Sequence, residues 1–280
     1  LSSTLGFGQW GTYVAHYPLT FPIRDAYNNL TLTYTDVQQL VTDAQGNVVQ
    51  PPTVNPLFPY VQIAKQTEIQ PGSRTDTTFN VNGTVTRAEM ARWTIRSQMD
   101  EDAISGYLTS TGGVFCSFAD VTCPGANGTA VSNTTGVSGD WRYIETMYRR
   151  GYTKGCAATI DAVRRFCPAE NLSRGQMAVF IIRAKMNSVF PTVVSGAYAG
   201  SFGGDLFGLP AAATGYFTDI DTDTPATATT QANFKEFAPY IRKLRELRIT
   251  NGKNLTTTFV PGDLLTRGEI AAFIVRAFFF

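Results

Sequence analysis

The residues best placed to do chemistry are three arginines, each carried by a short motif that occurs three times in the chain. The motif is a hydroxyl residue, an arginine, a small residue and then Glu or Gln, followed by an apolar run. Its copies start at Thr86, Ser173 and Thr266 and supply Arg87, Arg174 and Arg267. The hydroxyl and the acid or amide three residues later form a capping box, which predicts a helix start. An arginine at the first helical position faces the positive end of the helix dipole, at a cost of about a few tenths of a kcal/mol unless an anion is near.

A second motif lies upstream of each capping box and consists of an aromatic residue, any residue, Asp and a β-branched residue. Its aspartates are Asp36, Asp120 and Asp219. The two motifs together allow two interpretations. In the structural one, each aspartate returns to the helix start and pairs with the arginine, which locks a unit to itself or to its neighbour. In the binding one, the arginine and the free helix amides form an anion pocket.

The elements that position these residues also repeat. A helical stretch follows each aspartate, most clearly where Tyr240, Ile241, Leu244 and Leu247 fall at helical spacing. It ends in a turn with a glycine, and these glycines are Gly72, Gly155 and Gly252. Each unit is therefore a helix, a glycine turn, a short extended piece and a capped helix. We expect the units at residues 33–110, 111–187 and 216–280.

The order of these motifs resembles the S-layer homology (SLH) repeats of bacterial surface proteins. The resemblance includes a Phe, one residue and Pro before the second and third capped helices, at Phe166 to Pro168 and Phe259 to Pro261. It implies a mainly α fold with three units around a pseudo-threefold axis. It also implies that anionic, pyruvylated cell-wall polysaccharide binds in grooves between units. The family's binding residues would then fall on Arg87, Arg174 and Arg267 and on Gly72, Gly155 and Gly252.

Two regions lie outside the units. Residues 1–32 alternate apolar and polar side chains and predict an extended, strand-like N-terminal arm. Residues 188–215 form a long segment rich in Gly, Ala and aromatic residues, which exceeds the length of a simple connection.

The four cysteines indicate the compartment. Neither spacing matches the C-x-x-C of zinc or redox sites, so two disulfides are favoured over a metal site or four reduced thiols. We predict pairs that join Cys116 to Cys123 and Cys156 to Cys167, which indicates an oxidising, extracellular setting.

Composition excludes several classes. A net charge of +1 gives no basic surface for nucleic acid, and no apolar run is long enough for a membrane span. The single histidine, His16, has no local catalytic partner, and no cofactor motif occurs. Asp219, Asp221 and Asp223 resemble the start of a calcium loop, but Thr224 and Pro225 follow where glycine is needed. We therefore expect a solvated acidic turn there and no metal.

Three functions remain, in order of preference. Little of the chain is left as cargo once the units are assigned, so we favour a self-assembling subunit of a surface layer or filament, with copies of itself as partners. An anchor that binds anionic cell-wall polysaccharide is the alternative, and an enzyme comes third. In the first two cases the protein is extracellular, at the cell surface.

Overall fold

The computed structural model describes residues 34–37, 45, 55–67, 69, 77–124, 130–131, 139–156, 164–186, 217–220, 237–253 and 258–280. Its helices are α3 (Phe58–Gln66), α4 (Arg87–Arg96), α5 (Glu101–Ser110), α6 (Trp141–Arg149), α7 (Arg174–Met186), α9 (Ala238–Glu246) and α10 (Arg267–Phe278). The short strands β1 (Cys123–Pro124) and β2 (Ala130–Val131) pair antiparallel. The predicted mainly α class is confirmed. The expected arm at 1–32 and the long segment at 188–215 lie outside the described residues.

The capping boxes start the three central helices, as predicted. Thr86 and Thr266 each accept a hydrogen bond from the backbone of the Glu three residues on, and that Glu binds the cap amide in return. Ser173 and Gln176 make the same exchange at α7, with both bonds at 3.2 Å. Each box therefore satisfies two helix-end donors that would otherwise lack partners.

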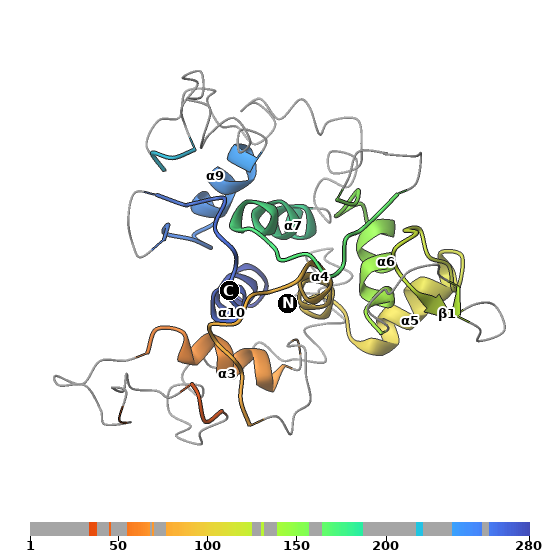
Figure 1. Ribbon diagram of the computed structural model, residues 1–280, viewed down its shortest axis with the longest axis horizontal. Helices are drawn as coiled ribbons and strands as arrows, with labels where there is room; N and C mark the ends of the chain where they lie inside the picture. Colours follow the sequence, from red (N-terminus) through yellow and green to blue (C-terminus); the bar gives the residue numbers. More distant parts are fainter. Residues whose placement is uncertain are drawn as a thin grey trace, which may run out of the picture.

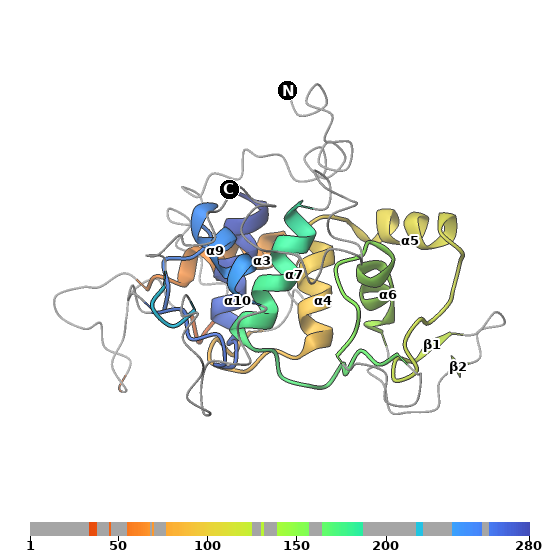
Figure 2. The ribbon, with the colours of Figure 1, turned by 90° about the horizontal axis from the view of Figure 1, so that it is seen from above.

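The central helices α4, α7 and α10 lie side by side and contact one another (Figures 1 and 2). An outer helix covers each of them: α3 packs on α10, α6 on α4 and α9 on α7 (Figure 1). With the units taken as predicted, at 33–110, 111–187 and 216–280, the outer helix of each unit packs on the central helix of another unit. The additional helix α5 packs outside α6.

The core lies where the three central helices contact one another. Met90, Met177 and Ile270 occupy the same motif position and are fully buried, as are the alanines that follow them. Burial on several sides explains why α7 has apolar residues around most of its circumference and shows little helical periodicity in its sequence. The outer helix α9, by contrast, keeps one polar side, and its Ile241 and Leu244 face the core.

Backbone hydrogen bonds join the three units just before the capping boxes. The amide of Val85 donates to the carbonyl of Leu265, that of Leu265 to Leu172, and that of Leu172 to Val85, at 2.8–3.0 Å. All three residues are fully buried. The set forms a closed ring of hydrogen bonds, which we call the backbone ring.

The two predicted disulfides are present. Cys116 is joined to Cys123 and Cys156 to Cys167, with Cα atoms 6.0 and 5.9 Å apart. The second disulfide connects the glycine turn at Gly155 to the turn that precedes α7. Within the described residues, no helix combines the length and apolar character needed to span a bilayer.

Gly155 gives a direct test of the fold. Its φ is +107°, and a Cβ there would lie 2.3 Å from the carbonyl oxygen of Arg165. Gly155→Ala should therefore lower the free energy of unfolding by about 2 to 4 kcal/mol, measured by urea denaturation. Gly106→Ala is the matched control, because Gly106 lies inside α5 with no atom near the new methyl group. This substitution should raise the free energy of unfolding by about 0.5 to 1 kcal/mol. Equal effects from the two substitutions would contradict the assigned turn.

Candidate anion-binding site

Each of the three motif arginines forms a hydrogen bond to the backbone of another unit. Nε of Arg87 donates to the carbonyl oxygen of Phe166 at 2.8 Å. Arg174 makes the same bond to Phe259 at 2.9 Å, and Arg267 makes it to Phe79 at 2.7 Å. Each guanidinium also lies over the ring of the phenylalanine that it binds, about 5 Å from its centroid. The three contacts run from the first unit to the second, from the second to the third, and from the third to the first.

The aspartates bind the backbone amides of the same phenylalanines whose carbonyls bind the arginines. The carboxylate of Asp120 accepts hydrogen bonds from the backbone amides of Phe166 and Cys167, at 2.8 and 2.7 Å. Asp36 and Asp219 bind the corresponding amide pairs in their own units. The residue after each phenylalanine has a positive φ of 57–58°, which turns two successive amides toward the carboxylate.

The expected direct pairing of aspartate with arginine is therefore wrong. The phenylalanine backbone stands between the two charges: its amide binds the aspartate of its own unit, and its carbonyl binds the arginine of another unit. Two convergent amides are strong partners for a carboxylate, since together they use both of its oxygens. The aspartates hold the turns that the arginines bind.

The expectation of free helix amides is also wrong. The amides of Arg87 and Ala88 at the start of α4 donate to the carbonyls of Glu170 and Pro168. The first two amides of α7 and α10 bind carbonyls of other units in the same way. Any anion site at these helix starts must consequently depend on side chains.

Two of the arginines form an ion pair across the unit boundary. Nη1 of Arg174 lies 2.6 Å from Oε1 of Glu269, and Nη1 of Arg267 lies 2.9 Å from Oε1 of Glu89. The second oxygen of each glutamate accepts the hydrogen bond from its own cap amide. Burial lowers the pKa of Arg174, while Glu269, Asp263 and Asp219 act in the opposite direction.

Arg87 lacks such an ion pair because the corresponding residue is Gln176. The single oxygen of this amide accepts from Ser173. Arg87 is 3% exposed, and its Nη2 is buried with no hydrogen-bond partner among the described residues. Burial lowers the pKa of Arg87, with Glu170 and Asp120 opposing the shift, but a guanidinium remains charged at neutral pH.

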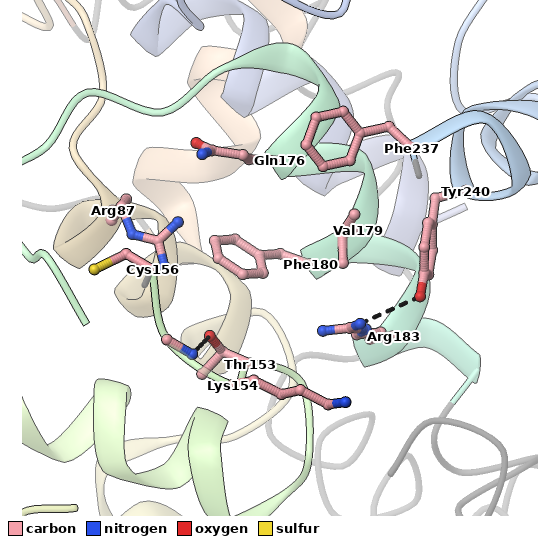
Figure 3. Close-up of a pocket in the computed structure, with 11 residues that line it drawn as sticks. Arg87, Thr153, Lys154, Cys156, Gln176, Val179, Phe180, Arg183, Phe237 and Tyr240 are labelled. Carbon is pink, nitrogen blue, oxygen red and sulfur yellow. Dashed lines mark hydrogen bonds between the residues drawn. The ribbon is translucent and has the colours of Figure 1, made fainter. Parts of the chain in front are cut away.

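A cavity of about 330 Å³ opens beside Arg87, between α4, α7, α9 and the glycine turn of the second unit (Figure 3). Its lining combines cations, aromatic rings and small polar groups: Arg87, Lys154 and Arg183; Phe180, Phe237 and Tyr240; and Thr153, Gly155, Cys156, Gln176 and Val179. The described lining contains no carboxylate. Arg183 makes long contacts of 3.3 and 3.4 Å to Tyr240 and Tyr152, and its buried Nε has no partner in the described part of the chain. The cavity can therefore hold an anion with an apolar face.

The structure brings Arg87 and Gly155 together in this cavity. Arg174, Arg267 and Gly252 lie at the equivalent places of the other units, and Gly72 is outside the described residues. So are Asp221 and Asp223 of the suggested calcium loop. Sequence reasoning missed Gln176, Lys154 and Arg183, although an arginine nine residues after each motif arginine is a repeated feature that points to Arg183.

A different group of possible metal ligands consists of Asp120, Cys156 and Cys167, whose ligand atoms lie within 4.8 Å of one another. The two sulfurs are joined in a disulfide, and Asp120 is bound by two amides. This group is therefore occupied by structural bonds.

One segment of the chain matches a known family. Residues 54–91 match the S-layer homology domain. The SLH match covers α3 and the start of α4, including Arg87, together with the residues between them. Such a domain is a surface-anchoring module, which supports a bacterial cell-surface, S-layer-associated protein. A comparison with curated proteins found no match.

Arg174 tests the role of the arginines in stability. Its side chain is 2% exposed, so Arg174→Ala leaves the Phe259 carbonyl and Glu269 without their partner. We expect a loss of about 3 kcal/mol in the free energy of unfolding. Arg142→Ala is the control, since Arg142 is 30% exposed and pairs with a glutamate that is 42% exposed, and it should cost less than about 1 kcal/mol. Similar losses for both variants would contradict the structural role of Arg174.

Proposed function

We propose that this chain is a non-enzymatic protein of a bacterial cell surface that binds anionic cell-wall polysaccharide between its units. The observation that carries the proposal is the buried, unpartnered Nη2 of Arg87 at a cavity whose described lining has cations and no carboxylate. The SLH match at residues 54–91 supports the same class of ligand.

We propose further that the units at 33–110, 111–187 and 216–280 are three SLH-type repeats around a pseudo-threefold axis. The support is that equivalent residues make equivalent contacts in all three. The aspartate-to-amide bonds occur once within each unit. The arginine-to-phenylalanine bonds and the bonds of the backbone ring also occur once per unit, and they connect each unit to the next and the third unit back to the first.

The composition of the cavity suits an acidic sugar. Lys154 and Arg183 add positive charge around Arg87, while Phe180, Phe237 and Tyr240 supply flat apolar surface. A sugar ring has an apolar face that can lie against aromatic side chains, and a carboxylate on the ring can reach the guanidinium. Pyruvylated polysaccharide carries both features.

The same groups favour binding over catalysis. Arginine and lysine side chains stay protonated at neutral pH, so they hold an anion but do not accept and return a proton readily. The cavity therefore presents fixed charge and an apolar surface to its ligand, which are the properties of an anchoring site.

Sedimentation with cell walls tests the proposal. The wild-type protein should sediment with walls that carry pyruvylated polysaccharide and stay in solution with walls stripped of it. Lys154→Ala removes one exposed cation at the cavity and should lower the bound fraction about 3- to 10-fold. Lys65→Ala in α3 makes the same change of charge outside the cavity lining and should bind as wild type. Equal binding to intact and stripped walls would refute the proposal.

Self-assembly into a layer or filament stays a prediction from the sequence. It is favoured by the aromatic, alternating residues 1–32, which precede the helical units and offer an arm that can dock on a neighbouring copy. The alternative is that the arm folds back over the units of its own chain.

Deleting residues 1–30 tests the arm, with the mass in solution measured by light scattering. A folded, soluble monomer that retains its helical circular dichroism is the expected result. A truncated protein that still forms the assemblies of the full chain would exclude the arm as the assembling element.

A further inference from the structure

The three motif arginines have the same bond to a phenylalanine carbonyl, but they differ in their second partner. Arg174 and Arg267 each meet a carboxylate of the following unit, from Glu269 and Glu89. At the Arg87 site the equivalent motif position holds Gln176, an amide of nearly the same shape with one oxygen and one NH₂ group, which lines the same cavity as Arg87. The three arginine sites are thus closely related and differ mainly in whether Glu or Gln occupies this motif position.

We propose that Gln176 makes the Arg87 site the one motif-arginine site of the three that accepts an external carboxylate, with one acidic sugar bound per chain. Glu269 and Glu89 act as internal ligands that already occupy the other two arginines. This inference rests on the proposed polysaccharide binding and assigns it to one cavity and one residue.

The capping box fixes the orientation of Gln176. Each glutamate of the motif gives one oxygen to its cap amide and the other to an arginine. Gln176 gives its only oxygen to the amide of Ser173. Its NH₂ group therefore takes the place of the oxygen that would bind Arg87. The Arg87 site then has donors on both sides where the other two sites pair a donor with an acceptor, and one donor cannot satisfy another.

The surroundings of Arg87 restrict what can satisfy these donors. Its Nε is bound to the Phe166 carbonyl, and the rings of Phe166 and Phe180 lie 5.0 and 5.3 Å from the guanidinium carbon. What remains is the edge formed by Nη1 and Nη2. Nη1 is the atom that meets a glutamate in Arg174 and Arg267, and Nη2 of Arg87 has no partner among the described residues. A planar acceptor with two oxygens can bind this edge and also accept from the NH₂ group of Gln176. A carboxylate has this geometry.

The wider electrostatics are compatible with one bound carboxylate. Glu170 and Asp120 are the acidic groups that act on Arg87. The carboxylate of Asp120 is held by two backbone amides. Lys154 and Arg183 line the cavity from the glycine turn and from α7, and they increase its positive charge (Figure 3). Inorganic phosphate can also bind an arginine through two oxygens, but it has no apolar ring face to lie against the aromatic side chains of the cavity.

The test is isothermal titration calorimetry with a methyl glycoside of a 4,6-O-pyruvylated hexose. The methyl ester of the same compound has nearly the same shape without the charge, and inorganic phosphate is the alternative anion. Wild-type protein should bind the acid with a stoichiometry of one and bind the ester and phosphate at least about tenfold more weakly.

Two substitutions of Gln176 separate the effect of an added negative charge from the effect of losing the amide group. Gln176→Glu supplies the missing internal carboxylate and should weaken binding of the acid at least about tenfold. Gln176→Met removes the amide donor but leaves Arg87 unoccupied, so binding should fall only about threefold. The melting temperature of Gln176→Glu should equal or exceed that of wild type, because the new glutamate pairs with Arg87. This readout shows that lost binding does not come from unfolding.

Several outcomes would overturn the inference while the proposed function stands. These are a stoichiometry above one, wild-type affinity in Gln176→Glu, equal losses in both variants, or tighter binding of phosphate than of the acid. Binding to intact walls without binding of the pyruvylated glycoside also overturns it, since the ligand class is then different. Failure to bind both the glycoside and the walls refutes the proposed function itself.

Discussion

The three units are held together by the backbone ring. It consists of Val85, Leu172 and Leu265, and each of them donates a backbone hydrogen bond to one unit and accepts one from another. Because all three are fully buried, a missing partner would leave an amide or carbonyl without a hydrogen bond in the core. No unit can satisfy these groups alone. The capping boxes follow directly after the ring, so the ring also sets where α4, α7 and α10 begin relative to one another.

The charged residues depend on this placement. A turn such as Phe166–Cys167 is bound by Asp120 through its amides and by Arg87 through its carbonyl. The arginine can therefore make its bond only when the turn of the other unit is in the correct position. The aspartate stabilises the left-handed conformation of that turn. Because the carbonyl bond and the ring contact already fix the guanidinium, the identity of the residue opposite, Glu269 or Gln176, changes the charge of the site with little demand on the fold.

Much of this arrangement could be predicted from residue types. The capping boxes, the disulfide partners of Cys116 and Cys156, and the involvement of Asp120 near a helix start all follow from local chemistry. The partner of Arg87 could not be predicted, because a backbone carbonyl has no sequence signature and the expected carboxylate was the more obvious choice. The role of Gln176 was equally hidden. Its amide caps a helix as well as a glutamate does, and the difference matters only where the arginine of another unit meets it.

The packing of each outer helix on the central helix of another unit has a consequence for how such a chain can change in evolution. An open stack of repeats can lengthen by adding a copy at either end. Here α3 already covers α10, so the face of the last central helix that would receive a further outer helix is taken by the first one. Extra sequence between the existing elements leaves these contacts intact. The helix α5, which packs outside α6, shows that the fold accommodates an element in such a position.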